Sequence, residues 1–376
     1  MLAKTPPLGW NSWNTFAENI TEDLLMETAD AMISSGLKDA GYEYVVIDDC
    51  WSLRQRGADG RLIADPEKFP HGMKYLADYI HSKGLKFGMY SCAGTRTCAG
   101  YPSSFEYELV DAQTFAGFGV DFLKYDFCNK PRHADGPLLY HRMSLALKAS
   151  GREILFSACN WGSDHVETWI RSTGAHMYRS TGDIFDNFQS MSDIARSRID
   201  KLAYSAPGCF DDIDMLVCGM RNKGNVAAGG MRDEEYLFHF ALWCVMQSPL
   251  MIGCDIRDMD AATKATLLNK ELLRINQDVE ARPAFPFNCG RRDHPEREFL
   301  GFKHLADNEF LLFGFNFNDK ARDCFVEFYD IGLPAGCALR LRDIMTGAEV
   351  PAAKDYMRLQ LPAHGFQIYR GKLITL

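Results

Sequence analysis

The stretch KFGMYSCAGTRTCAGYPSSFEYELVDAQTFAGFGVDFLKYD, residues 86–126, indicates how this chain folds. Its two ends, residues 86–92 and 120–126, are short apolar and aromatic runs, which are typical of buried β-strands. Residues 110–118 between them have the composition of a helix. A strand, a helix and a second strand in this order predict two parallel strands joined by a crossover helix.

The same alternation extends from about residue 6 to about residue 275. The strand candidates are residues 6–12, 42–49, 86–92, 120–126, 153–159, 175–182, 214–219 and 249–254, with helical patterns between them such as 22–36, 72–84 and 232–246. This number of units fits a TIM (β/α)8 barrel, which typically takes about 250 residues. A doubly wound sheet is the competing layout, but neither GxGxxG nor GxxxxGK[ST] follows an early strand. We therefore predict a barrel of the α/β class.

The last quarter of the chain has a different pattern. Short segments alternate apolar and polar residues and are separated by turn sequences such as FNDK and PAHG; they are residues 297–304, 309–316, 323–329, 338–343, 356–361 and 365–370. This pattern predicts a small antiparallel β-sandwich. The proline-rich residues 283–287 are the expected linker. We predict a catalytic barrel over residues 1–282 and the sandwich over 288–376.

Composition excludes several classes of partner. The chain is 47% hydrophobic and has a formal net charge of −9 without a Lys/Arg run. Nucleic acids and anionic membranes both require a basic surface, so a neutral small molecule suits this chain better. The first residues hold no apolar run long enough for a secretory signal, and no 18 apolar residues are consecutive. We therefore expect a cytoplasmic protein, and the oligomeric state stays open, a homo-oligomer included.

The 12 cysteines are scattered, and many lie in apolar segments. Most are expected to be small buried hydrophobic residues. No CxxC pair occurs and the histidines have no ligand spacing. We predict no metal site and no cofactor.

Acidic and aromatic residues collect where the predicted strands end, which is where TIM barrels build their sites. They include Trp10, Trp13, Asp48, Asp49, Trp51, Tyr90, Lys124, Asp126, Asn160, Trp161, Arg179, Asp183, Asp211, Asp212 and Asp214. Clustered unpaired charge costs stability, so this convergence favours function over folding as its cause. Aromatic rings stack on the C–H face of a sugar while carboxylates bind its hydroxyls. We therefore predict a sugar as the substrate.

A pair of carboxylates at this mouth can hydrolyse a glycosidic bond, one as nucleophile or base and one as proton donor. Asp126 and Asp183 follow the fourth and sixth strands. Lys124 lies two residues before Asp126, so both side chains point to the same side of an extended strand. The cation is expected to keep Asp126 ionised, which suits a nucleophile.

Longer motifs carry a further signal, namely PPLGWNSWNTF, VVIDDCW, TCAGYPSSFEYELVDAQTFAGFGVDFLKYDFC, RSTGDI and HFALWCVMQSPLMIGCDIR. They resemble those of the α-galactosidases and α-N-acetylgalactosaminidases of glycoside hydrolase family 27, in clan D. The resemblance implies a retaining, metal-free enzyme. It would remove terminal α-D-galactosyl residues from oligosaccharides or glycoconjugates by double displacement.

The resemblance also implies roles for single residues. Asp126 would be the nucleophile and Asp183 the acid/base. Asp48 and Asp49 would hold the galactose O4 and O6 hydroxyls, with Lys124 on the O3/O4 side. The remaining substrate-binding residues would be Arg179 on the O2 side, Trp13 and Tyr90 in the pocket lining, Asp214 beside the acid/base, and Cys98, Asn160 and Trp161.

Two departures from the family bear on specificity. Where CEW is common, this chain reads CNW at 159–161, so Asn160 replaces a Glu that contacts O2. An α-N-acetylgalactosaminidase stays open if Asn160 and Ser163 leave room for an acetamido group. A β-L-arabinopyranosidase is a further alternative, but Asp49 leaves room for the hydroxymethyl group that this sugar lacks. FDDIDML at 210–216 replaces WNDPDML, which bears on the leaving group. We expect galactose.

The resemblance leaves one cysteine pairing open. Cys98 and Cys128 follow strand ends beside the predicted nucleophile, and related enzymes bridge such a pair. A reducing cytoplasm would instead keep both thiols free. We expect activity to survive a reductant with little loss.

Two other classes of function are weaker alternatives. A metal-dependent barrel enzyme could use Asp48, Asp126 and Asp214 as ligands and Lys124 as base. Full activity in EDTA would contradict that reading. A lectin-like barrel without catalysis would have no need of both Asp126 and Asp183.

Overall fold

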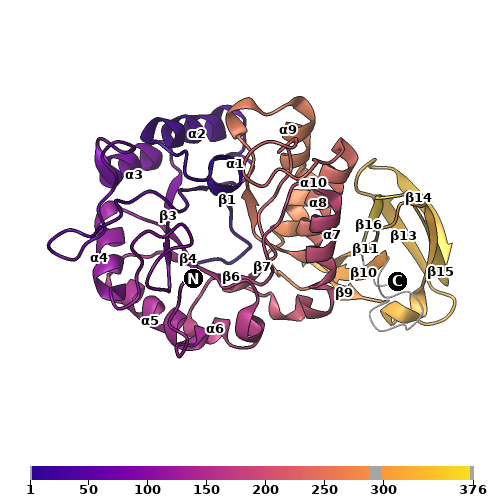
Figure 1. Ribbon diagram of the computed structural model, residues 1–376. Coiled ribbons are helices and arrows are strands. Elements are labelled where there is room, and N and C mark those ends of the chain that lie inside the picture. Colours follow the sequence, from indigo (N-terminus) through magenta and orange to yellow (C-terminus); the bar gives the residue numbers. More distant parts are fainter. Residues whose placement is uncertain (1, 288–297, 373–376) are drawn as a thin grey trace.

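The structure is a computed structural model that describes residues 2–287 and 298–372. Figure 1 shows a ring of helices around a curled sheet, with a second, all-β region at the side. The sheet consists of β1 (Leu8–Asn11), β2 (Tyr44–Val46), β3 (Lys86–Cys92), β4 (Phe122–Asp126), β5 (Leu155–Cys159), β6 (Met177–Arg179), β7 (Phe210–Asp212) and β8 (Leu250–Ile252). Its strands are parallel in the order β7-β6-β5-β4-β3-β2-β1-β8. A parallel bridge between Leu216 and Ile252 joins the two edges, so the predicted TIM barrel is confirmed.

The seventh strand is where the prediction was wrong. Residues 214–219 were expected to form it, but β7 is Phe210–Asp212. Asp214 has a φ of 86°, which ends the extended conformation there. Residues 216–218 follow as a loop, and their side chains are fully buried. Their apolar pattern therefore reflects burial, and their pairing with β8 is limited to the bridge between Leu216 and Ile252.

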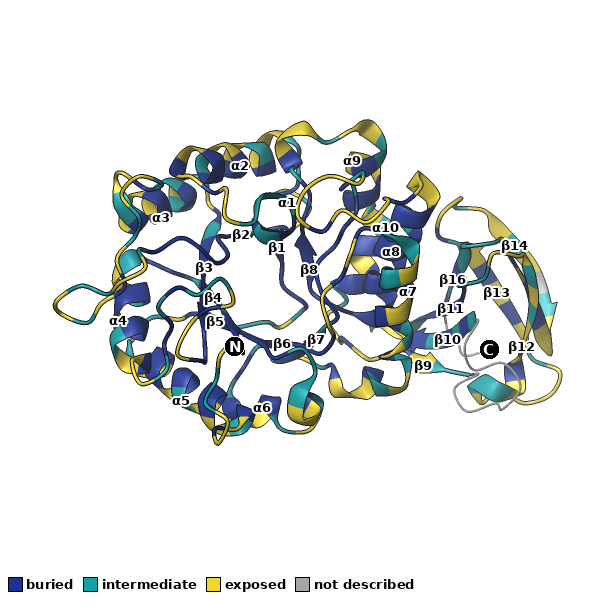
Figure 2. Ribbon diagram, in the orientation of Figure 1, coloured by how far each residue is buried: buried dark blue, intermediate teal, exposed yellow. Residues whose placement is uncertain are grey.

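The helices pack their apolar faces on the sheet and expose the opposite faces, as Figure 2 shows. They are α1 (Trp13–Phe16), α2 (Glu22–Ser34), α3 (Gly72–Ser82), α4 (Glu108–Phe118), α5 (Gly136–Ala149), α6 (Ile170–Thr173), α7 (Phe188–Arg196), α8 (Asp233–Met246), α9 (Ala261–Leu267) and α10 (Lys270–Asn276). Short 3₁₀ turns occur at Ser163–Thr168, Ile199–Tyr204, Ile256–Asp258, Ala306–Asn308 and Phe328–Ile331. Across residues 2–287 and 298–372, no helix has the length and apolar character that crossing a membrane requires.

Helix α8 connects the barrel to the C-terminal region. Almost every side chain from Glu235 onward is buried. Phe238 contacts Phe315 and Phe366 of the C-terminal sheet, with ring centroids 5.2 and 6.2 Å apart. A helix that is apolar on all sides is covered on all sides, and here the barrel and the second region provide the two covers.

The C-terminal region is the antiparallel β-sandwich that the sequence predicts. Its strands are β9 (Phe285–Pro286), β10 (Glu298–His304), β11 (Glu309–Asn316), β12 (Arg322–Glu327), β13 (Ala338–Asp343), β14 (Glu349–Lys354), β15 (Tyr356–Leu361) and β16 (Phe366–Lys372). One sheet has the order β14-β13-β16-β11-β10-β9, and β12 pairs with β15 in the other. Phe310 and Leu312 of the first sheet share one buried cluster with Leu359 and Leu361 of the second.

Two strand predictions need comment. β14 was missed because it contains Pro351, which cannot donate a backbone hydrogen bond. At the edge of a sheet that donor is not needed, so the proline is tolerated. Residue 288, where the second region was predicted to begin, and residue 297 lie outside the described residues.

Candidate active site

A cavity of about 460 Å³ opens at the carboxyl ends of the barrel strands. It brings together all but one of the predicted site residues, namely Trp13, Asp48, Asp49, Tyr90, Cys98, Lys124, Asp126, Trp161, Arg179, Asp183 and Asp214. These residues come from strand ends that are far apart in the sequence. Their convergence follows from the parallel register, because every strand ends at the same rim.

Asp48 and Lys124 form a buried ion pair in this cavity. Nζ of Lys124 lies 2.8 Å from Oδ2 of Asp48, and the two side chains are 16% and 2% exposed. Nδ2 of Asn11 donates to the same oxygen at 2.7 Å. Burial by itself would lower the pKa of Lys124, but the negative charges around it, that of Asp48 first, together outweigh burial and raise that pKa above its ordinary value. The ammonium group therefore stays charged.

Asp49, the next residue, is held by backbone groups. Its Oδ2 accepts a hydrogen bond from the backbone N–H of Ala99 at 3.0 Å, and its Oδ1 accepts one from Cys50 at 2.7 Å. Burial raises the pKa of Asp49. The loop after β3 is thereby fastened to the end of β2, and the Asp49 carboxylate is oriented within the cavity wall.

Asp126 ends β4 and is almost completely buried. Its Oδ2 accepts a hydrogen bond from the Tyr90 hydroxyl at 3.0 Å, and its Oδ1 accepts one from the backbone N–H of Phe127 at 2.9 Å. Burial raises the pKa of Asp126 to about 6, although the charge of Lys124 lowers it. The prediction that Lys124 sets the charge state was therefore incomplete, because desolvation is the larger effect. The carboxylate is still mainly ionised at pH 7.

Asp183, the predicted acid/base, lies on the loop after β6 and lines the same cavity as Asp126. Its side chain is 70% exposed, and its Oδ1 accepts a hydrogen bond from Arg179 at 2.8 Å. The same guanidinium nitrogen lies 2.7 Å from Oδ2 of Asp214. Asp214 Oδ2 also accepts the backbone N–H of Ile184 at 2.6 Å. Arg179 and Asp214 together therefore position the loop that carries Asp183.

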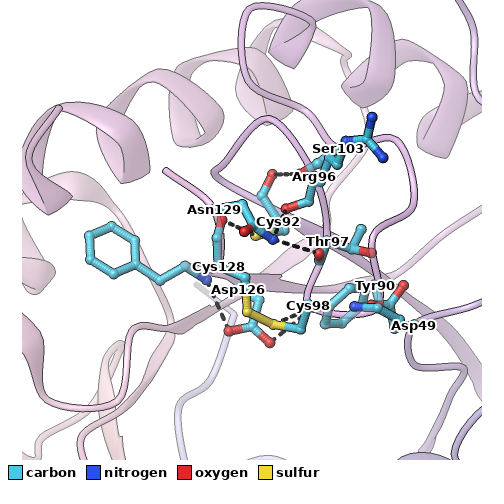
Figure 3. Close-up of a disulfide and its surroundings, with 12 residues drawn as sticks. Asp49, Tyr90, Cys92, Arg96, Thr97, Cys98, Ser103, Asp126, Cys128 and Asn129 are labelled. Carbon is cyan, nitrogen blue, oxygen red and sulfur yellow. Dashed lines mark hydrogen bonds between the residues drawn. A yellow bond between two sulfur atoms is a disulfide. The ribbon is translucent and has the colours of Figure 1, made fainter. Parts of the chain in front are cut away.

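Cys98 and Cys128 are joined by a disulfide, with their Cα atoms 5.2 Å apart. Figure 3 shows the bridge directly beside Asp126 and near Tyr90. The Tyr90 hydroxyl lies 3.5 Å from the sulfur of Cys98. Free thiols, which a reducing cytoplasm would maintain, are thus not what the structure has. The cytoplasmic location itself stays a prediction.

Asn160 is the predicted site residue that the structure does not bring to the cavity. Its side chain is fully buried, and its Nδ2 donates to the backbone oxygen of Ser163 at 3.0 Å. Its neighbours Cys159 and Trp161 do line the cavity. Trp161 has a φ of 59°, and this left-handed turn sends consecutive side chains to different sides.

Several other strand-end residues also turn away from the cavity. Asp211 pairs with buried Arg198 at 2.9 Å instead of lining it. Trp10 donates from its indole nitrogen to the backbone oxygen of Cys254, and Trp51 donates in the same way to Tyr90. Phe210 and Asp211, the two substituted positions of FDDIDML, are both buried and do not line the cavity. They therefore lie in the barrel wall and not on the surface that a leaving group would touch.

Sequence reasoning missed part of the lining, namely Asn14, Cys128, Cys159, Ile184, Phe185, Met215, Asn225 and Val226. Asn225 and Val226 belong to the long loop after β7. The backbone N–H of Asn225 donates to the oxygen of Asn14 at 2.8 Å, which holds this loop over α1. Gly224 permits the contact, since a Cβ there would lie 2.7 Å from the Cα of Thr15. In the sequence, only the glycines of this loop indicate that its backbone could lie so close to that of Thr15.

The proposed metal ligands do not meet. In the part of the chain that the structure describes, the group with ligand atoms close together is Cys98, Asp126 and Cys128. Two of its sulfur atoms are bonded to each other and so do not offer two thiolates. Asp48 is instead paired with Lys124, and Asp214 with Arg179.

Comparison with known proteins gives one consistent result. The family described as "Alpha galactosidase A" matches residues 5–278. Alpha-galactosidase 3 of Arabidopsis thaliana is 49% identical over 281 residues, which cover 74% of this chain and 61% of that protein. The alpha-galactosidase of Oryza sativa subsp. japonica is 45% identical over 372 residues, covering 98% and 85%. The crystal structure of alpha-galactosidase I from Mortierella vinacea superposes with a TM-score of 0.89 at 33% identity, covering 98% of this chain and 97% of that chain.

Proposed function

Because the chain belongs to the alpha galactosidase A family of glycoside hydrolases, we propose that it hydrolyses terminal α-D-galactosyl residues of oligosaccharides or glycoconjugates. The family spans the whole barrel, and relatives named alpha-galactosidase match nearly the full chain. The reaction is a double displacement in which the product keeps its anomeric configuration.

One contrast supports the assignment of catalytic roles. Asp126 is buried and receives two hydrogen bonds, whereas Asp183 is 70% exposed, and both line one cavity. A nucleophile must be ionised and held still beside the anomeric carbon, which suits Asp126. An acid/base must exchange protons with the leaving group and with water, which suits Asp183.

The proposed mechanism has two steps. Asp126 attacks the anomeric carbon while Asp183 gives its proton to the departing oxygen, and a covalent glycosyl-enzyme forms. Asp183, now ionised, takes a proton from water, and the resulting hydroxide equivalent displaces Asp126. The enzyme returns to its starting protonation state.

The remaining lining residues would hold the sugar. Asp48 and Asp49 offer carboxylate acceptors for O4 and O6, and Lys124 and Arg179 offer charged donors on the O3/O4 and O2 sides. Trp13 and Tyr90 supply aromatic faces. Each charged group already has a partner in the cavity, so each is oriented before a sugar enters.

Galactose is the preferred sugar over its alternatives. A site for an N-acetylgalactosaminyl residue would place small side chains where the acetamido group sits, but Arg179 and Trp161 line this cavity. Asp49 leaves space for a hydroxymethyl group. β-L-Arabinopyranose has no such group, so a β-L-arabinopyranosidase would not need this space.

A panel of nitrophenyl glycosides tests the proposal. We expect kcat/KM to be highest for the α-galactoside, compared with the α-N-acetylgalactosaminide and the β-L-arabinopyranoside. Proton NMR of the earliest product should show α-galactose. A higher kcat/KM for the α-N-acetylgalactosaminide would refute the choice of sugar, and β-galactose as first product would refute retention.

A further inference from the structure

A second cavity adjoins the catalytic one. It measures about 610 Å³ and shares Cys98, Cys128 and Trp161 with the catalytic cavity. It adds Phe127, Asn129, Lys130 and Arg132. Because Asp126 and the charged pairs belong to the first cavity, the second lies outside the proposed galactose site. A leaving group that extends from the galactose would enter it.

The two cavities differ in charge. Five carboxylates line the catalytic cavity, those of Asp48, Asp49, Asp126, Asp183 and Asp214. The charged residues of the adjoining cavity are both basic, Lys130 and Arg132. This runs against the chain as a whole, whose formal net charge is −9. A local positive patch on an acidic protein indicates recognition of a negative group.

Neither cation is neutralised by a carboxylate in the part of the chain that the structure describes. Over residues 2–287 and 298–372, no carboxylate forms a salt bridge with Lys130 or Arg132. Nζ of Lys130 donates to the backbone oxygen of Ala134 at 2.9 Å and lies 5.0 Å from the ring centroid of Phe127. Its charge is therefore held beside an aromatic face and still lacks an anionic partner.

The start of the segment that carries these cations, residues 128–130, is firmly held. The disulfide fastens Cys128 to Cys98, and Nδ2 of Asn129 donates to the backbone oxygen of Thr97 at 2.9 Å, as Figure 3 shows. The two backbones approach so closely that a Cβ on Gly94 would lie 1.9 Å from the oxygen of Cys128. Lys130 thus has a defined position next to the catalytic cavity, which a mobile surface lysine would not have.

Aromatic rings form the wall of the same cavity. Phe127 stacks on Tyr140 with ring centroids 5.7 Å apart, and its ring meets Trp161 edge-on at 6.4 Å. Phe127 is only 4% exposed and so supports Lys130 and Trp161, whereas the partly exposed ring of Trp161 can contact a sugar. The cavity therefore combines a surface for a sugar ring or chain with two unpaired cations.

We propose that this cavity is a leaving-group subsite that favours α-galactosides whose next residue carries a carboxylate, such as a uronate or an aldonate. The inference rests on the proposed α-galactosidase activity and adds the class of leaving group. Lys130 and Arg132 pair with the carboxylate, and Trp161 contacts the carbon chain. The chemistry at Asp126 and Asp183 is unchanged.

Melibionate and melibiitol provide a matched pair of substrates. Both are open-chain derivatives of melibiose and release a primary alcohol from galactose, and they differ in a terminal carboxylate against a hydroxymethyl group. We expect kcat/KM for melibionate to exceed that for melibiitol by roughly two- to tenfold at low salt, the range for two exposed ion pairs. The preference should shrink in 0.5 M NaCl, where the screening length is only about 4 Å.

Variants assign the preference to the two cations. In Lys130→Gln/Arg132→Gln the ratio of the two kcat/KM values should fall to about one, while hydrolysis of melibiitol changes little. Lys354→Gln, which removes an exposed cation on β14 in the sandwich, should keep the wild-type ratio. The wild-type comparison and its salt dependence need no variant, so they decide the question even if the double variant folds poorly.

The outcomes separate the two proposals. Equal rates on both substrates, a preference for melibiitol, or a preference that survives the double variant would overturn the subsite. Failure to cleave melibiitol, melibionate and 4-nitrophenyl α-galactoside alike would instead overturn the proposed function.

Discussion

Arg179 and Asp214 form an ion pair of 2.7 Å at the wall of the catalytic cavity, and each side chain is only 6% exposed. The same Asp214 oxygen accepts the backbone N–H of Ile184, the residue after Asp183. The Arg179 nitrogen also donates to Asp183 itself. A buried pair in the barrel wall thus determines where an exposed carboxylate at the mouth can lie.

Asp214→Asn tests this arrangement. Asparagine tolerates the left-handed backbone at this position, so the change removes the charge without adding strain. It leaves the Arg179 guanidinium buried with a single carboxylate, and we expect the free energy of unfolding to fall by about 3 kcal/mol. We also expect kcat/KM for melibiose to fall. Chemical denaturation measures the first effect, and Asp323→Asn, which breaks an exposed pair with Arg358, should cost less than about 1 kcal/mol. Equal losses in the two variants would contradict the argument.

The loss of kcat/KM at acidic pH should follow the protonation of Asp126. Burial raises its pKa to about 6, so the nucleophile is protonated and activity is lost as the pH falls through about 6. The Tyr90 hydroxyl stabilises the ionised form, and Tyr90→Phe should move this loss of kcat/KM upward by about one pH unit. A loss that does not move would mean that another group controls it.

Asp126→Asn should stabilise the fold while abolishing turnover. The pKa of Asp126 rises from 3.8 to about 6 on folding, so the folded protein binds more protons between these values and its stability falls as the pH rises through them. At pH 7 this cost is up to about 3 kcal/mol. We expect the variant to unfold at higher denaturant concentration at pH 7, and the gain to disappear below about pH 4. A variant less stable than the wild type at pH 7 would refute the burial cost.

Asp183→Ala separates the acid/base from the nucleophile. The loss of proton donation should reduce kcat/KM for melibiose by about 100-fold or more, because its alcohol leaving group needs a proton. The nitrophenolate of 4-nitrophenyl α-galactoside leaves without one, so its first step should slow much less. Asp183 is mainly exposed, and folding stability should stay within about 0.5 kcal/mol. Equal losses on both substrates would show that Asp183 is not the acid.

The disulfide should be structural. Cys98 and Cys128 are 30 residues apart, and closing such a loop stabilises a protein by about 3.6 kcal/mol. We expect Cys98→Ser/Cys128→Ser to lose about this much and to lose activity, since the bridge lines the cavity. Cys324→Ser, a change at a free and partly exposed cysteine, serves as the control. Unchanged stability and activity in the double variant would support the original expectation that activity survives a reductant.

The sequence by itself determined the barrel, the sandwich and most of the cavity lining. Alternating strand and helix patterns are local, and parallel strands in a barrel all end at one rim. Residues such as Asp48, Asp126 and Arg179 therefore meet wherever their strands end, whatever their distance along the chain. The same reasoning placed Trp13 and Tyr90 in the lining.

Only the tertiary structure decided which of these residues contact each other. Lys124 shares β4 with Asp126, but its salt-bridge partner is Asp48, 76 positions away, since barrel register brings their charged atoms together. Asn160 follows a strand end and yet turns inward, because the left-handed conformation of Trp161 redirects the chain. Periodicity specifies the face of a strand on which a side chain lies. Its partners across the barrel depend on register, twist and loop conformation, which are properties of the packed molecule.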